Sequence, residues 1–202
     1  MADGLPKLYL ARHGETEWSL SGQHTSFTDI PLTPRGEENA RRLAERLKHI
    51  EFAKVFTSPL VRARRTCDLA GYGPVAVADA DLVEWNYGDY EGRRTADIRQ
   101  ERPGWRLFRD GCPNGESFDA VRERADRVIA RLRMVAGDTL VFAHSHFLRI
   151  LTARWLGLPV ADARLFVLAT ASVSVLGYEH ALDEPALQLW NDHLLQRSPV
   201  RE

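Results

Sequence analysis

The sequence predicts a three-layer α/β/α domain with a mostly parallel central sheet. Short apolar runs of strand length alternate along the chain with longer segments whose apolar residues recur at helical spacing. No internal repeat or Pro-, Gly- or Ser-rich linker divides the 202 residues, so we expect a single domain over 1–202. Hydrophobic residues make up 44% of the chain, which is enough to bury a sizeable core.

The first half of the chain contains two predicted strands, each followed by a predicted helix. The apolar run 8–11 indicates a buried strand. Thr33 and Pro34 then provide an N-cap and a first-turn proline for a helix. Residues 55–56 form a short strand candidate, and Pro59 is expected to open the next helix.

The second half repeats this alternation. Ser117 is typical of an N-cap, and a stripe of apolar residues predicts a helix that ends before Gly137. Another helix is expected over 147–156. Further strands are predicted at 140–143, 172–176 and 186–190. The segment 82–116 fits neither period, and we interpret it as an excursion over the top of the sheet.

Composition excludes several classes of partner. The chain carries 27 basic and 28 acidic residues, so it lacks the broad positive surface of a nucleic-acid binder. No apolar run approaches the roughly 20 residues of a membrane helix, and the first residues lack the apolar region of a secretory signal. Cys67 and Cys112 are the only cysteines, too few for a disulfide scaffold. We therefore expect a reduced, cytoplasmic protein without nucleic-acid or membrane partners.

Unusual residues follow three of the predicted strands. The first strand runs into Arg12-His13-Gly14, the second is followed by Ser58 and Arg62, and the third runs into His144-Ser145-His146. Ligands of open α/β sheets bind at the carboxyl ends of the strands, where these residues would meet. A buried cluster of two arginines and two histidines needs an anion to offset its charge.

Phosphate fits this cluster best. Arginine presents a planar fork to phosphate oxygens, and a neutral imidazole can attack phosphorus directly. Gly14 would let the backbone approach the phosphate, and a backbone carbonyl could hold the second ring nitrogen of His13. Glu84 is our candidate for protonating the leaving oxygen. Trp85 would raise the pKa of Glu84 by desolvation, and nearby arginines would lower it. The sequence does not decide which of these two effects is larger.

Other chemistries fit less well. Neither cysteine has an arginine six positions later, which excludes a cysteine phosphatase, and no phosphate-binding Walker loop or serine elbow occurs. His144 and His146 could form a metal pair, but His146 lies beyond the strand end and the arginines would repel a divalent cation. We therefore expect no metal and no other cofactor.

Four motifs in order resemble the histidine phosphatase superfamily, which includes the cofactor-dependent phosphoglycerate mutases. They are the segments 10–18, 57–63, 82–92 and 142–144. The resemblance implies that His13 becomes phosphorylated, that Arg12, Arg62 and His144 grip the phosphoryl group, and that Glu84 donates a proton. Thr25 and Ser26 match substrate-contacting positions. The residues expected to bind substrate are Ser19, Gln23, Thr25, Ser26 and Ser145.

Two departures favour a phosphatase over a mutase. Ser19 stands where the mutases carry Asn, and at 202 residues we expect the chain to lack their longer middle insertion and C-terminal extension. The motifs are similar to the branch that holds fungal sedoheptulose-1,7-bisphosphatase and compact bacterial acid phosphatases. We expect a phosphomonoesterase acting on a small sugar phosphate, best a seven-carbon bisphosphate. A mutase and a non-catalytic phosphate-binding relative are the alternatives, and dimers in the family make a homodimer an open expectation.

A bisphosphate would need a second anion site at the mouth of the pocket. The excursion contains six arginines that could supply it: Arg93, Arg94, Arg99, Arg102, Arg106 and Arg109. A solvated basic surface explains most of them equally well.

Overall fold

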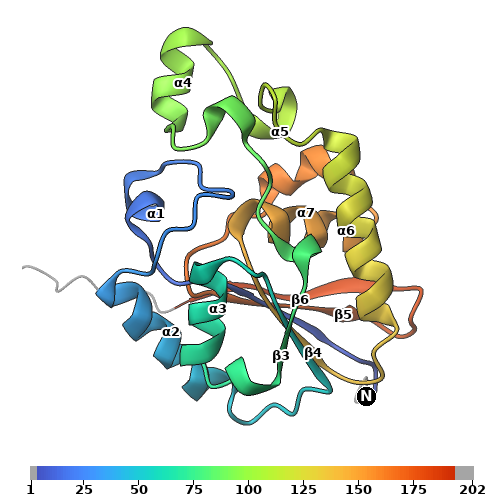
Figure 1. The fold of residues 1–202 in the computed structure, drawn as a ribbon. Coiled ribbons are helices and arrows are strands. Elements are labelled where there is room, and N and C mark those ends of the chain that lie inside the picture. Colours follow the sequence, from blue (N-terminus) through green and yellow to red (C-terminus); the bar gives the residue numbers. More distant parts are fainter. Residues whose placement is uncertain (1–3, 194–202) are drawn as a thin grey trace, which may run out of the picture.

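The computed structural model describes residues 4–193 and contains a six-stranded sheet of order β3-β2-β4-β1-β5-β6 (Figure 1). The strands are β1 (Leu8–Arg12), β2 (Lys54–Thr57), β3 (Ala76–Ala78), β4 (Thr139–Ala143), β5 (Val173–Tyr178) and β6 (Pro185–Asp192). Strands β1 to β4 are parallel, whereas β5 is antiparallel to both of its neighbours. The predicted mostly parallel sheet is confirmed.

Helices cover both faces of this sheet because its central strands are apolar on both sides. In β1, Leu8 and Leu10 pack with side chains of α6 and α7, whereas Ala11 packs with side chains of α2 and α3. Figure 1 shows these two helix pairs on opposite sides of the strands. The helices are α2 (Pro34–Leu47), α3 (Val61–Leu69), α6 (Phe118–Arg133) and α7 (Ser145–Trp155). The predicted three layers are therefore confirmed.

The helix starts follow the predicted caps in two of three cases. The Thr33 and Ser117 hydroxyls accept hydrogen bonds from Gly36 and Ala120 backbone N–H groups, as expected for N-caps. The expectation that Pro59 opens a helix is wrong, because α3 begins at Val61. The N-cap residue Leu60 has no side-chain acceptor, and the Asp29 carboxylate takes that role by accepting from the Val61 N–H.

The excursion 82–116 contains two short helices, α4 (Thr95–Glu101) and α5 (Leu107–Asp110), which lie above the sheet at the top of Figure 1. Its aromatic residues Trp85, Tyr87 and Trp105 are buried in the same hydrophobic cluster as α6 and α7. The sequence analysis also missed α1 (Glu17–Ser21) and β3, which are too short to show a clear period.

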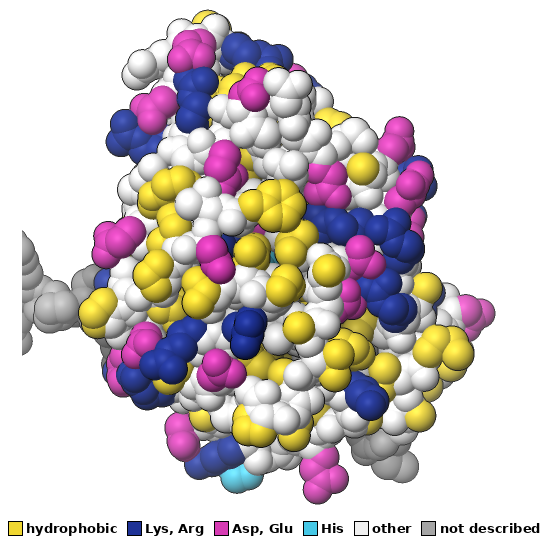
Figure 2. Space-filling view, viewed as in Figure 1, with side chains coloured by type: hydrophobic (Ala, Val, Ile, Leu, Met, Phe, Trp, Pro, Cys, Tyr) yellow, Lys and Arg dark blue, Asp and Glu magenta, His cyan; other side chains and the backbone are white. Residues whose placement is uncertain are grey.

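Charges of both signs are mixed over the face shown in Figure 2, in keeping with the balanced composition. None of the helices within residues 4–193 is both long enough and apolar enough to span a membrane.

The first turn of α2 and the loop after β1 touch backbone to backbone. A Cβ atom added at Gly36 would lie 2.2 Å from the Glu15 carbonyl oxygen, and one added at Gly14 would lie 2.5 Å from the Gly36 carbonyl oxygen. The lack of a side chain at Gly14 therefore serves contact with α2, and the approach of its backbone to phosphate stays a prediction. This contact fixes the loop that carries His13.

Substituting Gly36→Ala should destabilise the protein, because the added methyl group forces α2 and the His13 loop apart. We expect a loss of roughly 1–3 kcal/mol in the free energy of unfolding, measured by urea denaturation. Gly4→Ala is the matched control, since a Cβ there meets nothing within 4 Å. Equal stability of the two variants would contradict this account.

Candidate active site

The parallel pairing of β2, β4 and β1 brings three strand ends together. Arg12 is paired with Ala143, and Thr57 with Phe142, so the residues that follow are neighbours. The His13 N–H donates to the Ala143 carbonyl at 3.0 Å, and the Ser58 N–H donates to the Phe142 carbonyl at 2.9 Å. The predicted convergence at this edge is confirmed.

One ring nitrogen of His13 is fixed by its own loop. Its Nδ1 lies 2.7 Å from the Gly14 carbonyl oxygen, which can only accept a hydrogen bond. Nδ1 therefore carries the hydrogen, and Nε2 carries the free lone pair. Burial, followed by the charges of Arg62 and Arg12, holds the pKa of His13 well below its usual value of 6.5. At neutral pH, Nε2 is an uncharged nucleophile.

Thr66 joins the His13 loop to α3. Its hydroxyl oxygen accepts from the Gly14 N–H at 2.9 Å, and the hydroxyl donates to the Arg62 carbonyl at 2.7 Å. Both bonds are buried, so Thr66 holds the residue whose carbonyl orients His13. The sequence analysis did not single out Thr66. Thr66 lies four residues after Arg62 on the same helix, and a threonine hydroxyl on a helix can bond to the carbonyl four residues earlier. This spacing was the signal that could have pointed to Thr66.

Arg62 is fully buried and is held by backbone oxygens. Its guanidinium donates to the carbonyls of Ser26 at 2.9 Å, Thr28 at 3.2 Å and Thr25 at 3.3 Å. The Glu91 carboxylate in turn accepts from the Ser26 and Thr28 N–H groups, which shapes this loop. Burial lowers the pKa of Arg62, but its neutral acceptors leave the positive charge unpaired.

His144 lies between Arg62 and Ser58. Its Nδ1 accepts from the Arg62 Nε–H at 3.1 Å, and its Nε2 lies 2.8 Å from the Ser58 hydroxyl oxygen. The His144 and His13 rings are 5.2 Å apart between centroids. Burial, with the nearby Arg62, holds the pKa of His144 well below 6.5, so it is neutral and donates through Nε2.

Arg12 supplies a second cation, half-buried, beside His13. Its terminal nitrogen donates to the Leu168 carbonyl, while its Nε–H is buried without a hydrogen-bond partner among residues 4–193. Burial lowers the pKa of Arg12 to about 10, which still leaves it charged at neutral pH. A charged group with an unpartnered donor fits an anionic ligand.

The carboxylate of Glu84 is held at the first turn of α7. Oε1 accepts from the Trp85 N–H at 2.9 Å and the Phe147 N–H at 2.8 Å, and Oε2 accepts from the His146 N–H at 3.0 Å. Trp85 thus contacts Glu84 through its backbone, while its indole N–H donates to the Glu116 carbonyl. Oε2 keeps one lone pair free, which makes it the oxygen able to carry a proton.

A cavity of about 240 Å³, which we call the His13 cavity, opens at this strand edge. Seven of the expected site residues line it: Arg12, His13, Ser19, Gln23, Thr25, Glu84 and Ser145. Arg62, His144 and Ser26 do not line it. Arg62 and His144 are completely buried behind His13, and Ser26 holds Arg62 through its carbonyl.

Seven lining residues were not among the expected substrate or catalytic groups: Thr16, Trp18, Gly22, His24, Tyr87, Thr95 and His146. The Tyr87 hydroxyl lies 2.6 Å from His146 Nδ1, and the His24 ring lies 4.8 Å from that of Tyr87. Tyr87 falls within a motif that carried the family resemblance, which was the signal for it.

Residues 4–193 contain no group of three His, Cys, Asp or Glu side chains arranged as metal ligands. Burial raises the pKa of both Cys67 and Cys112 to about 12, so the thiols are protonated and poor nucleophiles. Among residues 4–193, the neutral imidazole of His13 is therefore the best placed nucleophile.

Comparison with known families agrees with this geometry. Residues 8–193 match the model of the histidine phosphatase superfamily (branch 1). The chain belongs to this superfamily. The fold and the enzyme class predicted from the motifs, a phosphatase of the histidine phosphatase type, are thereby confirmed.

Two relatives and one solved structure match this histidine phosphatase over nearly its whole length. Sedoheptulose 1,7-bisphosphatase of Saccharomyces cerevisiae is 36% identical, over 91% of this chain and 92% of the relative. An acid phosphatase of Mycobacterium tuberculosis is 39% identical, over 90% and 91%. A solved Mycobacterium tuberculosis structure superposes with a TM-score of 0.88 at 37% identity, covering 93% of this chain and 98% of that one.

Substituting Thr66→Val in the histidine phosphatase should lower kcat, because the buried Gly14 N–H loses its acceptor and the carbonyl that orients His13 becomes less restrained. We expect a loss of about 10-fold, in line with an unpaired buried group of 1–3 kcal/mol. Thr66→Ser keeps the hydroxyl and should restore kcat. Equal rates for the Val and Ser variants would contradict this positioning role.

Stability should fall as pH is lowered from 7 towards 4. Burial lowers the pKa of His24 to about 4, against 6.5 in the unfolded chain. Between these values the unfolded state binds more protons, so stability rises with pH. This difference corresponds to about 3 kcal/mol for His24.

Urea denaturation of wild type and His24→Gln at pH 7 and pH 4.5 measures this effect. The variant should lose less stability between the two pH values than the wild type. An unchanged pH dependence would show that His24 is not buried in its neutral form.

Proposed function

We propose that this histidine phosphatase hydrolyses phosphomonoesters of small sugars through a phosphohistidine at His13. The observation that carries the proposal is the fixed Nδ1 of His13, which leaves the Nε2 lone pair available in a cavity that Arg12 also lines. A neutral nucleophile beside the guanidinium groups of Arg12 and Arg62 is suited to a phosphate dianion.

In the first step, Nε2 of His13 attacks phosphorus and the bond to the ester oxygen breaks. Glu84 Oε2 gives its proton to that oxygen, so the sugar leaves as an alcohol. The guanidinium of Arg12 stabilises the charge on the phosphoryl oxygens. Behind His13, Arg62 adds positive charge, and the neutral His144 ring contacts both Arg62 and the His13 ring.

In the second step, water attacks the phosphorus of phosphohistidine and the nitrogen–phosphorus bond breaks. The Glu84 carboxylate, deprotonated by the first step, accepts a proton from this water. Inorganic phosphate leaves, and His13 regains its lone pair. The same carboxyl group serves both half-reactions.

A mutase would instead return the phosphoryl group to a sugar acid. The Ser19 hydroxyl, at the position where the mutases carry Asn, bonds to the Thr16 backbone and caps α1. This use of Ser19 favours transfer to water. A non-catalytic phosphate-binding relative is disfavoured by the complete set of His13, Arg12 and Glu84 around one cavity.

The specific substrate we propose is a seven-carbon bisphosphate such as sedoheptulose 1,7-bisphosphate. The 36% identical yeast sedoheptulose 1,7-bisphosphatase supports this choice. A small phosphorylated molecule is therefore the proposed partner, in a cytoplasmic setting. A homodimer stays a prediction.

A phosphate-release screen over sugar mono- and bisphosphates tests this function. His13→Ala should lose at least roughly two to three orders of magnitude in kcat, because no other group replaces the nucleophile. His49→Ala is the matched control. His49 is exposed just after α2, so this variant should keep full activity. Isomerised product without steady phosphate release would indicate a mutase, and phosphate binding without turnover of any ester would indicate the non-catalytic relative.

A further inference from the structure

The guanidinium group of Arg12 depends on a single backbone carbonyl for its position. Among residues 4–193 its side chain forms one hydrogen bond, to the Leu168 carbonyl oxygen, whereas the Arg62 side chain donates to four acceptors. Leu168 is buried in the turn 168–171, which leads into β5. The position of the cation beside the nucleophile therefore depends on how firmly this turn is held.

Packing against α2 does not hold the turn. A cavity of about 120 Å³ adjoins it, lined by Ala169, Thr170 and Ala171 of the turn and by Arg42 and Arg46 of α2. Side chains of residues 4–193 leave this space unfilled. Ala171 also has a φ of 50°, a left-handed conformation that is unfavourable for alanine. A strained turn beside an open space needs restraint from other contacts.

The side chain of Asn191 in β6 provides this restraint. Its Oδ1 accepts a hydrogen bond from the Ala169 N–H at 2.7 Å. The Ser172 hydroxyl donates to the Ala169 carbonyl at 2.7 Å, so side chains bind both backbone polar groups of Ala169. Asn191 is itself anchored, because its N–H donates to the buried Ser174 hydroxyl at 3.0 Å.

Asn191 and Arg12 hold opposite ends of one peptide group. The Leu168 carbonyl and the Ala169 N–H belong to the same planar trans unit, in which the two bonds point in opposite directions. The carbonyl accepts from Arg12, and the N–H donates to Asn191. Rotation of this unit would break both hydrogen bonds, and each bond polarises the unit in favour of the other.

A β-bulge in β6 directs Asn191 towards the turn. Val173 is paired with Asp192 and Val175 with Leu189, so β6 contains one residue more than β5 between these pairs (Figure 1). Within the bulge, Asn191 has a φ of 55°, which asparagine adopts more readily than most residues. Bulges commonly redirect a side chain next to an active site.

We propose that Asn191 is a positioning residue for the phosphatase reaction. Through the peptide group that follows Leu168, it holds the guanidinium of Arg12 in place for the phosphoryl group. This inference rests on the proposed function, because it assumes that the phosphoryl group lies at His13. The pairing of β1 with β5 positions only the backbone here: the Arg12 N–H donates to the Ser172 carbonyl, which leaves the guanidinium free to move.

Replacing Asn191 in two ways tests this role. Asn191→Gly removes the acceptor of the Ala169 N–H without straining a backbone at positive φ, and Asn191→Asp keeps an acceptor oxygen there. The Gly variant should lose about 10-fold in kcat for para-nitrophenyl phosphate, and the Asp variant should retain most of it. Gln188→Ala is the matched control on the same strand. The Gln188 amide donates to the Tyr178 carbonyl, so this variant should keep full activity.

A double-mutant cycle with Arg12 separates positioning from a general effect on the fold. If Asn191 acts through Arg12, Asn191→Gly should cost less than about 2-fold in kcat in the Arg12→Gln and Arg12→Lys backgrounds. Thermal unfolding verifies that each variant is folded at the assay temperature. The same loss of kcat with and without the Arg12 guanidinium would overturn the proposal, and so would equal rates for wild type and Asn191→Gly.

Binding of inorganic phosphate, measured by calorimetric titration, separates this inference from the proposed function because it needs no turnover. Asn191→Gly should bind phosphate about 10-fold more weakly than wild type, and should make no difference in the Arg12→Gln background. If this pattern appears but no ester is hydrolysed, the function fails and the positioning role stands. If esters are hydrolysed but neither kcat nor phosphate binding couples Asn191 to Arg12, only the positioning role fails.

Discussion

The packing of two unpaired guanidinium groups against an uncharged imidazole is the constraint on which this site depends. Arg12 donates to a backbone carbonyl, and Arg62 donates to three carbonyls and to His144. Among residues 4–193, neither forms a salt bridge. Because the acceptors are neutral, the positive charge persists at the strand edge, where it adds to the effect of burial in lowering the pKa of His13 and keeping it deprotonated. The same positive charge that helps to keep the nucleophile neutral therefore also attracts phosphate.

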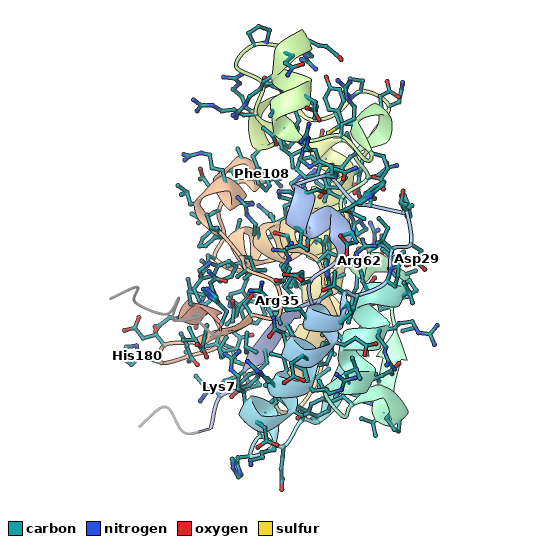
Figure 3. The ribbon with its side chains drawn as sticks, turned by 90° about the vertical axis from the view of Figure 1, so that its left-hand side faces the viewer. Lys7, Asp29, Arg35, Arg62, Phe108 and His180 are labelled. Carbon is teal, nitrogen blue, oxygen red and sulfur yellow. The ribbon has the colours of Figure 1, made fainter. Side chains whose placement is uncertain are left out.

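The fold maintains this unfavourable cluster by means of contacts distant in sequence. Glu91 shapes the loop whose carbonyls hold Arg62, and Figure 3 shows Asp29, the acceptor at the start of α3, beside Arg62. Gly36 of α2 and Thr66 of α3 restrain the opposite side of the His13 loop. Each contact is small, but together they prevent the arginines from moving out into water.

Much of this arrangement was predictable from the sequence. Apolar strands of β1 and β4, buried on both faces, fix a layered parallel sheet, and parallel strands necessarily bring His13 and His144 to one edge. The N-caps Thr33 and Ser117 were also predictable, because a hydroxyl residue before a helical pattern is a local signal, and α2 and α6 begin directly after these residues in the folded chain.

Other features depend on contacts that no local pattern encodes. The carbonyl oxygens that hold Arg62 are backbone atoms, so side-chain identity gives no sign of them. The start of α3 shifts from Pro59 to Val61 because a distant carboxylate caps it. The role of Gly14 in helix contact, and the hydrogen bond between Asn191 and the Ala169 N–H, likewise require the fold.

The most direct test of a phosphorylated His13 is rapid quenching in base after mixing with ³²P-labelled substrate, followed by peptide mapping. A transient label on the peptide that contains His13, stable in base and lost in acid, is the predicted result. Phosphate release at the full rate with no label on that peptide at any time would contradict the account, because water would then attack the substrate directly.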